Sequence, residues 1–356
     1  MPLYLDLHEV DPDTFSIDDA YEAHFKDLSI QRKHGVTYHK YWISIDNKMS
    51  FCLMEGPSKQ ACHNVHLASH GLTACNIIEI TDKEFNLYLG MGNKDQHDLA
   101  RTPKGELDVG FRTLVQTDVL AFSENYKEFL IPLKEKLNQN FGTSVHEPKR
   151  SFTASFIYPT DAIAYVKEIQ KIISGVKCLP ETKLAIVTGK PVDKNGMTPF
   201  EKARGQLNDL ITFGRPFTLN MDTATKTLLG REGSAASIPE NTVFFGETDF
   251  KFLQELRSAI LDGLSDHTFK SANLSSALGL SKANAYRKLK EKTGLAPNQL
   301  INDIRLRKAM DIISKGELSV AEVAYATGFN SPTYFTRVFK KRFGILPTEY
   351  VKRHIV

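Results

Sequence analysis

The sequence predicts a multidomain protein with an α+β N-terminal region, an α/β middle region and an all-α C-terminal region. At 356 residues, the chain is longer than the roughly 100 to 200 residues of one typical domain. Strand and helix patterns alternate in the first part of the chain, whereas helical periodicity alone continues from Phe250, and a repeated unit occurs there. We expect domains at residues 1–85, 108–246 and 250–356, and a linker at 86–107.

Composition is that of a folded, water-soluble protein. The chain is 41% hydrophobic and 24% charged, and no apolar run is long enough to cross a bilayer. The first residues lack the basic head and apolar middle of a secretory signal, so we expect a cytoplasmic protein with no membrane contact. The four cysteines form no C-x-x-C pair and are interpreted as reduced thiols.

Charge is distributed unevenly along the chain. Residues 250–356 carry 18 Lys and Arg against 9 Asp and Glu, whereas the rest of the chain carries 27 against 33. A basic end on an acidic body favours a polyanionic partner, although a solvated surface alone would give the same asymmetry.

The N-terminal region shows the order strand, helix, strand, strand, helix, strand. Ser16 and Ser58 are candidate helix caps, and Gly35 and Gly71 are candidate helix ends. The expected elements are a strand at 2–8, a helix at 16–35, a hairpin at 36–45 and 50–56, a helix at 58–71 and a strand at 76–81. This order matches the ferredoxin-like split β-α-β unit.

The middle region also alternates strands and helices. We expect strands at 111–119, 151–157 and 183–193 and an amphipathic helix at 161–174. The preceding segment, 86–107, has glycines, a proline and mixed charges without an apolar period, which is typical of a linker.

The C-terminal region contains two copies of one helical unit. Each copy has an apolar helix, a glycine turn and a second helix, with Gly279 in the first copy and Gly328 in the second. Ala277 and Ala324 precede these glycines and allow close packing of the helices. This is the helix-turn-helix arrangement, and a helix at 297–314 joins the two copies.

Polar side chains outside the apolar stripe of each second helix are candidate DNA contacts. Amide and guanidinium groups can pair with base edges, and lysines can contact phosphates. These residues are Lys282, Asn284, Arg287, Lys288 and Lys290 in the first copy and Ser331, Thr333, Arg337, Lys340 and Lys341 in the second. Solvated faces of core helices are the alternative interpretation.

The stretches "LSSALGLSKANAYRKLKEKTGLAPNQLINDIRLRKAMDII" and "SVAEVAYATGFNSPTYFTRVFKKRFGILPTEYVKR" closely resemble the two helix-turn-helix units of the AraC/XylS family of bacterial transcription regulators. The resemblance covers 250–356. It implies a seven-helix module whose two recognition helices enter successive major-groove segments on one face of double-stranded DNA. It also implies base contacts by Lys282, Asn284, Ser331, Thr333 and Arg337.

Histidines are concentrated near the N-terminus, with seven of the chain's eleven between His8 and His70. His66 and His70 lie one turn apart on one helix face, His24 lies on the other helix, and His8 ends the first strand. Converging imidazoles could bind Ni²⁺, Zn²⁺ or Cu²⁺. Surface or locally hydrogen-bonded histidines are the alternative.

The fragments "MPLYLDLHEV", "AHFKDL", "KHGVTYHKYW", "FCLMEGPSKQAC" and "VHLASHG" resemble the small ferredoxin-like family of nickel-binding proteins. The resemblance implies a homodimer that binds nickel or another divalent metal, with Cys52 in the "FCL" strand. The histidines at the family's recurring positions are His8, His24, His66 and His70. The sequence departs from the family by having His34 where an aromatic is usual and by adding His39 and His63.

In the middle region, "FRTLVQTDVLAF", "TASF", "DAIAYVKEIQ" and "LAIVTGKPVD" resemble parts of a class III adenylyl cyclase domain. Such an enzyme uses two aspartates to hold metal ions. Asp118 stands at the first position, but Arg150 stands at the second, and Arg204 and Asn208 depart from the expected types. We expect a degenerate cyclase-like domain with no catalytic residues, kept for ligand sensing or dimerisation. An unrelated α/β domain is the alternative.

Together these features predict a transcription regulator that is not an enzyme, in which an N-terminal effector region controls a C-terminal DNA-binding module. A nucleotide cyclase with a DNA-binding appendage is the alternative function. A metal-storage or interaction protein is a third class.

Overall fold

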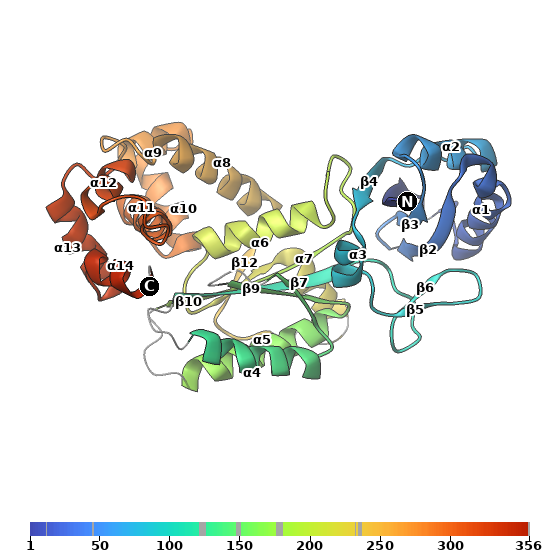
Figure 1. Cartoon of the computed structure of the whole chain (residues 1–356), viewed down its shortest axis with the longest axis horizontal. Coiled ribbons are helices and arrows are strands. Elements are labelled where there is room, and N and C mark those ends of the chain that lie inside the picture. Colours follow the sequence, from blue (N-terminus) through green and yellow to red (C-terminus); the bar gives the residue numbers. More distant parts are fainter. Residues whose placement is uncertain are drawn as a thin grey trace.

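The computed structural model places the three regions in a row, with the N-terminal sheet at one end, the middle sheet at the centre and the helical region at the other end (Figure 1). The structure describes residues 1–11, 13–44, 46–120, 126–146, 151–175, 181–231, 233 and 237–354. The predicted sequence of an α+β region, a mixed α/β region and an all-helical region is confirmed.

The N-terminal region is a four-stranded antiparallel sheet with the order β2-β3-β1-β4. Its elements are β1 (Leu3–Glu9), α1 (Ile17–Ile30), β2 (Thr37–Ser44), β3 (Met49–Glu55), α2 (Lys59–Ser69) and β4 (Asn76–Ile80). Successive side chains of β1 point to opposite faces. Tyr4 packs with Ala20 of α1 and Val65 of α2, whereas Leu5 and Leu7 pack in the core that continues into the middle region.

Local sequence signals fix the ends of α1 and α2 as predicted. Ser16 accepts a hydrogen bond from the Asp19 backbone, and the Asp19 carboxylate accepts one from the Ser16 backbone, which forms a capping box. The Ser58 hydroxyl caps α2 by accepting from the Ala61 backbone. Gly35 ends the 3₁₀ turn after α1 with a φ of 67°, a left-handed conformation that favours glycine.

The segment predicted as a linker carries ordered structure. It contains the end of α3 (Asp82–Tyr88) and a small sheet of β5 (Asn93–Lys94) and β6 (Ala100–Arg101). Leu99 and Ala100 are buried, and Leu99 forms a β-bridge with Tyr41 of β2. So short an apolar stretch has no readable period, and its burial against the first sheet was therefore not visible in the sequence.

The middle region is a six-stranded mixed sheet with the order β12-β11-β10-β7-β9-β8. The strands are β7 (Arg112–Leu120), β8 (Thr143–His146), β9 (Ser151–Phe156), β10 (Glu181–Gly189), β11 (Leu219–Asp222) and β12 (Thr242–Phe245). Strands β10, β11 and β12 run parallel, and the other neighbours are antiparallel. The strand predicted at 183–193 corresponds to β10, which ends four residues earlier, at Gly189.

Helices cover both faces of the middle sheet (Figure 1). Helices α4 (Tyr126–Gln139) and α5 (Pro159–Gly175) lie on one face, and α6 (Glu201–Phe213) lies on the other. Helix α7 (Thr223–Arg231) follows β11. Its residue Leu229 packs in the same hydrophobic core as the buried side chains of α5.

The C-terminal region contains seven helices within the described residues 247–354. They are α8 (Glu247–Gly263), α9 (Ser271–Ala277), α10 (Lys282–Thr293), α11 (Pro297–Ile313), α12 (Val320–Ala326), α13 (Pro332–Phe343) and α14 (Pro347–His354). The glycine turns predicted between the helices have a left-handed backbone, with a φ of 62° at Gly279 and 79° at Gly328. A Cβ atom at Gly328 would lie 2.3 Å from the Leu264 carbonyl oxygen, so only glycine fits there.

A closed ring of charges joins the middle sheet to the helical region. Glu181 of β10 accepts hydrogen bonds from Arg307 of α11 and Arg342 of α13. Asp303 of α11 accepts from the Nε atoms of the same two arginines, at 2.8 Å and 2.5 Å. The side chains of Glu181 and Asp303 are only 5% and 8% exposed, so their charges depend on these two partners.

A second contact reaches the first helix-turn-helix unit. The Arg215 guanidinium donates from Nε to the Glu291 carbonyl at the end of α10, at 2.9 Å. A cation at this position also complements the negative end of the α10 dipole. Lys292 of α10 forms an ion pair with Asp249 of α8 at 2.9 Å. Through Arg215 and through the bond between Glu181 and Arg342, the middle region contacts both helix-turn-helix units.

Replacing Asp303 by asparagine should lower the free energy of unfolding by about 3 kcal/mol near neutral pH, because Arg307 and Arg342 lose a buried partner. Burial opposes ionisation of this carboxyl, but the two arginines hold the pKa of Asp303 at about 2. The contribution is therefore complete above the unfolded pKa of about 4 and disappears as the pH falls toward 2. Urea unfolding at several pH values measures it.

The exposed Asp262→Asn variant is the control and should unfold like the wild type. If the difference in free energy of unfolding between Asp303→Asn and the wild type stays the same from neutral pH to about pH 3, the effect does not have an ionic origin.

Candidate metal centre and DNA interface

The four predicted metal-binding histidines line one cavity in the N-terminal region. The cavity has a volume of about 470 Å³ and lies between the sheet and helices α1 and α2. Its lining includes His8, His24, His66 and His70. The four histidines therefore do converge, which their spacing in the sequence could not establish. Their role as metal ligands stays a prediction.

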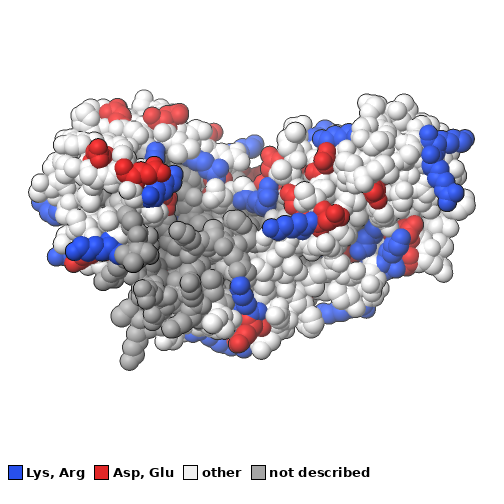
Figure 2. Space-filling model, in the orientation of Figure 1, with Lys and Arg blue, Asp and Glu red and all other residues white. Residues whose placement is uncertain are grey.

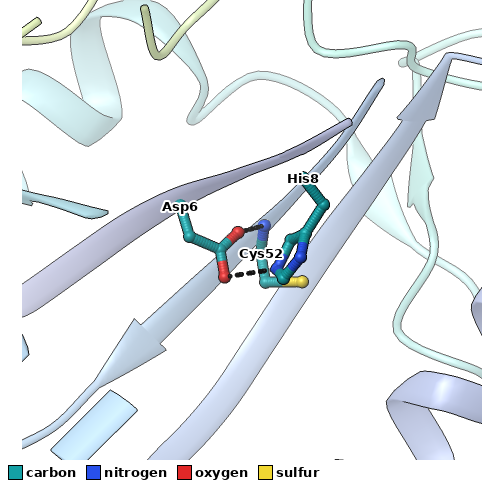
Figure 3. A group of neighbouring side chains, drawn as sticks. All are labelled: Asp6, His8 and Cys52. Atoms are coloured by element: carbon teal, nitrogen blue, oxygen red, sulfur yellow. Dashed lines mark hydrogen bonds and ion pairs between the residues drawn. The ribbon is translucent and has the colours of Figure 1, made fainter. Parts of the chain in front are cut away.

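Asp6 is fully buried and holds two of these histidines. Its Oδ2 atom lies 3.0 Å from Nε2 of His8 and 2.8 Å from Nε2 of His66. Its Oδ1 atom accepts a hydrogen bond of 2.5 Å from the backbone of Cys52. Figure 3 shows Asp6 and His8 of β1 directed toward Cys52 of β3. Although burial would raise the pKa of Asp6, the two histidines hold it well below its usual range.

Asp27 of α1 holds the other side of His66. Its carboxylate lies 3.1 Å from Nδ1 of His66 and 3.3 Å from Nε2 of His70, and it accepts a hydrogen bond from the Ser69 hydroxyl. Burial alone would lower the pKa of His66, but hydrogen bonds to Asp27 and Asp6 raise it to about 10. His66 is thus a buried imidazole fixed between two carboxylates.

His24 has a different environment. Its Nε2 atom lies 3.2 Å from the carboxylate of Asp98, and burial lowers its pKa. Its Nδ1 atom is buried without a hydrogen-bond partner among the described residues, as is the hydroxyl of Tyr41, whose ring centroid is 4.6 Å from that of His24. A neutral imidazole with an unpaired nitrogen is the form that binds a metal ion.

The donor atoms fall into two groups that fit a divalent transition metal. Each residue of a group offers one donor atom within 4.8 Å of the others. The groups are Asp6, His8 and Cys52, and Asp27, His66 and His70. Imidazole, carboxylate and thiolate donors suit borderline ions such as Ni²⁺ and Zn²⁺. Burial raises the pKa of the Cys52 thiol, so it would have to lose its proton to become a ligand.

Three acidic residues of this site were missed at the sequence level. Asp6 is two residues before His8 on β1, and Asp27 is three residues after His24 on α1, so the periodicity that located the histidines could also have found these carboxylates. Asp98 lay in the presumed linker and gave no signal. The additional histidines of the sequence do not line the cavity: His34, His39 and His63.

The ten predicted DNA contacts lie on α10 and α13 or at the cap of α13. Eight are exposed: Lys282, Asn284, Arg287, Lys290, Thr333, Arg337, Lys340 and Lys341. Lys288 is half-buried, with its ammonium group 4.0 Å from the centroid of the Phe252 ring. Ser331 is half-buried, and its hydroxyl accepts from the Tyr334 backbone as the helix cap. Contacts with DNA stay a prediction for all ten.

The opposite faces of these helices are core. Ala285 and Leu289 of α10 and Phe335 and Phe339 of α13 are all fully buried. On the face of the molecule in Figure 2, basic and acidic side chains are interspersed along the visible described surface. The positive charge of the C-terminal region therefore does not form one continuous patch on that described side.

Two cationic residues lie beside Asp118, which stands at the first aspartate position of the cyclase resemblance. Asp118 of β7 pairs in register with Lys183 of β10, and its carboxylate lies 4.0 Å from the Arg307 guanidinium. Arg150, the residue at the second aspartate position, lies outside the described residues. Of the other two atypical residues, Arg204 donates a hydrogen bond of 2.7 Å to the Thr198 hydroxyl, and Asn208 is exposed on α6.

Comparison with known proteins assigns two parts of the chain. Residues 274–353 match a family described as a helix-turn-helix domain, and residues 4–80 match a family described as nickel responsive protein SCO4226-like. No helix among the described residues is long and apolar enough to cross a membrane.

Similarity to individual proteins is limited to parts of the chain. Histidine kinase P4 of Formosa agariphila is 27% identical over 127 residues, which are 36% of this chain and 9% of the kinase. The HTH-type transcriptional regulator MtrA of Neisseria gonorrhoeae is 38% identical over 76 residues, 21% of this chain and 25% of MtrA. The crystal structure of SCO4226 from Streptomyces coelicolor A3(2) is 28% identical, covers 22% of this chain and 94% of that chain, and has a TM-score of 0.20.

The C-terminal helices and their family match define a helix-turn-helix DNA-binding domain. The chain joins this domain to an N-terminal domain whose residues 4–80 match the SCO4226-like family. The chain spans only 9% and 25% of the two curated relatives, and the middle region matches neither family.

Replacing Asp6 by asparagine should lower the free energy of unfolding by about 1 to 3 kcal/mol in metal-free buffer, because His8, His66 and the Cys52 backbone lose a charged acceptor. Urea unfolding of the chain measures this loss. Asp46→Asn is the matched control, since its carboxylate is 82% exposed. Equal stability of the two variants would show that Asp6 does not hold the pocket together.

Proposed function

We propose that the chain is a bacterial, cytoplasmic transcription regulator that binds double-stranded DNA as a homodimer. The observation that carries this proposal is the pair of helix-turn-helix units, α9 with α10 and α12 with α13, joined by the single helix α11. The similarity to MtrA supports a regulatory role. Polar and basic side chains remain exposed on both second helices, as DNA reading requires.

Within this proposal, the two helices α10 and α13 divide base reading and phosphate binding. Residues near the helix starts contact base edges, and lysines nearer the C-terminal ends contact phosphates. The base contacts are assigned to Lys282, Asn284, Ser331, Thr333 and Arg337. The remaining contacts are assigned to Arg287, Lys288, Lys290, Lys340 and Lys341.

The N-terminal domain is proposed to bind nickel or another divalent metal as the effector. Its element order and its sheet order support a ferredoxin-like fold. The residues that would hold the ion are His8, His24, His66 and His70, with Asp6 and Asp27 orienting the rings. A bound ion would supply a charge that favours one arrangement of the domains, and so change DNA affinity through a population shift.

The middle region is proposed to be a cyclase-like domain without catalytic activity. A cyclase needs metal ions beside its aspartates, but Asp118 lies next to Arg307 and Lys183. Two cations beside this carboxylate disfavour a metal ion there. A role in sensing or in dimer formation is therefore favoured over nucleotide cyclisation.

Replacing Arg337 by alanine should weaken binding to the preferred DNA site by about 1 to 3 kcal/mol and relax preference at one base position. Replacing Lys340 by alanine should instead weaken all DNA sequences alike and reduce the salt dependence by about one counterion. Binding to randomised duplexes at several salt concentrations measures both. A uniform loss in Arg337→Ala would refute base reading by this residue.

Replacing His66 and His70 by alanine should abolish Ni²⁺ binding measured by calorimetry, because two of the four imidazoles proposed to hold the ion are removed. Replacing only Asp27 by asparagine should weaken binding by about 10-fold to 100-fold through loss of ring orientation. The control is His39→Ala, whose side chain is 38% exposed and outside the cavity. Retained nickel affinity in the double variant would exclude the pair as ligands.

A further inference from the structure

A second cavity lies between the middle sheet and the helix-turn-helix domain. It has a volume of about 480 Å³, which is in the range of small-molecule sites. Its walls come from the start of β10, the connection from α6 to β11, and helices α11 and α13. The cavity therefore exists only while the domain is docked on the sheet.

Two ammonium groups line this cavity from opposite domains. Lys183 of β10 is 4% exposed, and its Nζ atom donates to the Thr212 carbonyl at 2.9 Å. Lys341 of α13 is exposed at the rim. Neither lysine forms an ion pair with the residues that the structure describes. Three carboxylates lie near Lys183. Glu181 and Asp303 are bonded to the two arginines of the charged ring, and Asp118 lies 4.0 Å from the Arg307 guanidinium.

Part of the remaining lining is apolar. It includes Phe213 and Phe217 from the middle region and Leu295, Leu300 and Val338 from the helical region. A buried lysine with one carbonyl partner is costly to keep charged, so burial lowers the pKa of Lys183 to about 8. An anion in the cavity would add a counter-charge that is not shared with the arginines, and the apolar part of the wall would contact an apolar body.

We propose that this cavity binds a small organic anion with an aromatic or aliphatic body, whose acidic group meets the ammonium groups of Lys183 and Lys341. This site is separate from the histidine pocket and would give the chain a second ligand. The anion bridges the middle sheet and α13, so it stabilises the docked arrangement.

The site has a consequence for DNA that depends on the proposed function. Lys341 is one of the proposed phosphate contacts, and its neighbour Arg342 is bonded to Glu181. An anion that occupies Lys341 therefore competes with a DNA phosphate. Because coupling between two sites is reciprocal, DNA must weaken anion binding by the same factor by which the anion weakens DNA binding.

The test uses anilinonaphthalene sulfonate, a fluorescent aromatic anion, and the full-length chain. We expect saturable binding of one probe per chain, weakened about tenfold or more by Lys341→Met, because a charge-assisted contact is lost. Lys340→Met is the matched comparison: the Lys340 side chain is also exposed but does not line the cavity, so the probe affinity of this variant should equal that of the wild type. Both variants should lose DNA affinity.

Two further measurements separate this site from general apolar binding. N-phenylnaphthylamine, the neutral counterpart of the probe, should bind wild type and Lys341→Met alike. Asn302→Trp, which places a large ring in the cavity wall on α11, should block the anionic probe. Equal probe affinity of Lys341→Met and Lys340→Met, or unchanged binding in Asn302→Trp, would overturn the proposal.

The outcome for DNA is read separately. Loss of the anion site with intact sequence-specific DNA binding would reject only this cavity as a ligand site. Intact anion binding by a chain that shows no preference among duplexes would reject only the proposed function. Addition of a preferred duplex should lower the apparent probe affinity, and an unchanged affinity would contradict competition at Lys341.

Discussion

The position of the DNA-binding domain depends on the buried ring of Glu181, Asp303, Arg307 and Arg342. Three of the four charges belong to the helical domain, and Glu181 belongs to the middle sheet. A buried ion pair contributes little when whole but costs several kcal/mol when one partner is missing. The ring therefore favours a single docked geometry more than it adds to stability. Undocking would leave both arginines with one carboxylate and Glu181 with none.

Contacts continue from this ring to the histidine pocket. Glu181 lies on β10, which pairs with β7 along its whole length, and β7 begins at Arg112. The buried Arg112 side chain bonds both oxygens of Asp108 at 2.8 Å, and Asp108 accepts from the indole of Trp42 at 3.1 Å. Trp42 follows Tyr41, whose ring packs on His24. Paired strands and buried hydrogen bonds thus link the charged ring to the histidine pocket. A continuous set of such contacts is the type of structure that can transmit a change in domain arrangement.

The sequence predicted those features that depend on local patterns. Periodicity located α1, α2 and the helix-turn-helix units. Ser16 and Ser58 marked the starts of α1 and α2, and Gly35 marked the end of the 3₁₀ turn after α1, because caps and turns are decided by neighbours in the chain. Spacing also selected four histidines that share one cavity. Contacts between distant segments could not be predicted in this way. Asp98 reaches His24 from the presumed linker, and the pairing of Glu181 with Arg342 joins residues 161 positions apart.

Charge balance explains why the histidine pocket suits a divalent cation. Asp6 and Asp27 place two carboxylates in the protein interior, where an isolated negative charge is costly. Both pKa values are held low by the neighbouring histidines, so both groups stay ionised. A proton on His66 balances one of these two negative charges. A doubly charged ion among the same donors would match the two carboxylates and free His66 to act as a neutral ligand. The pocket would therefore select its ligand by charge as well as by the number of imidazole rings.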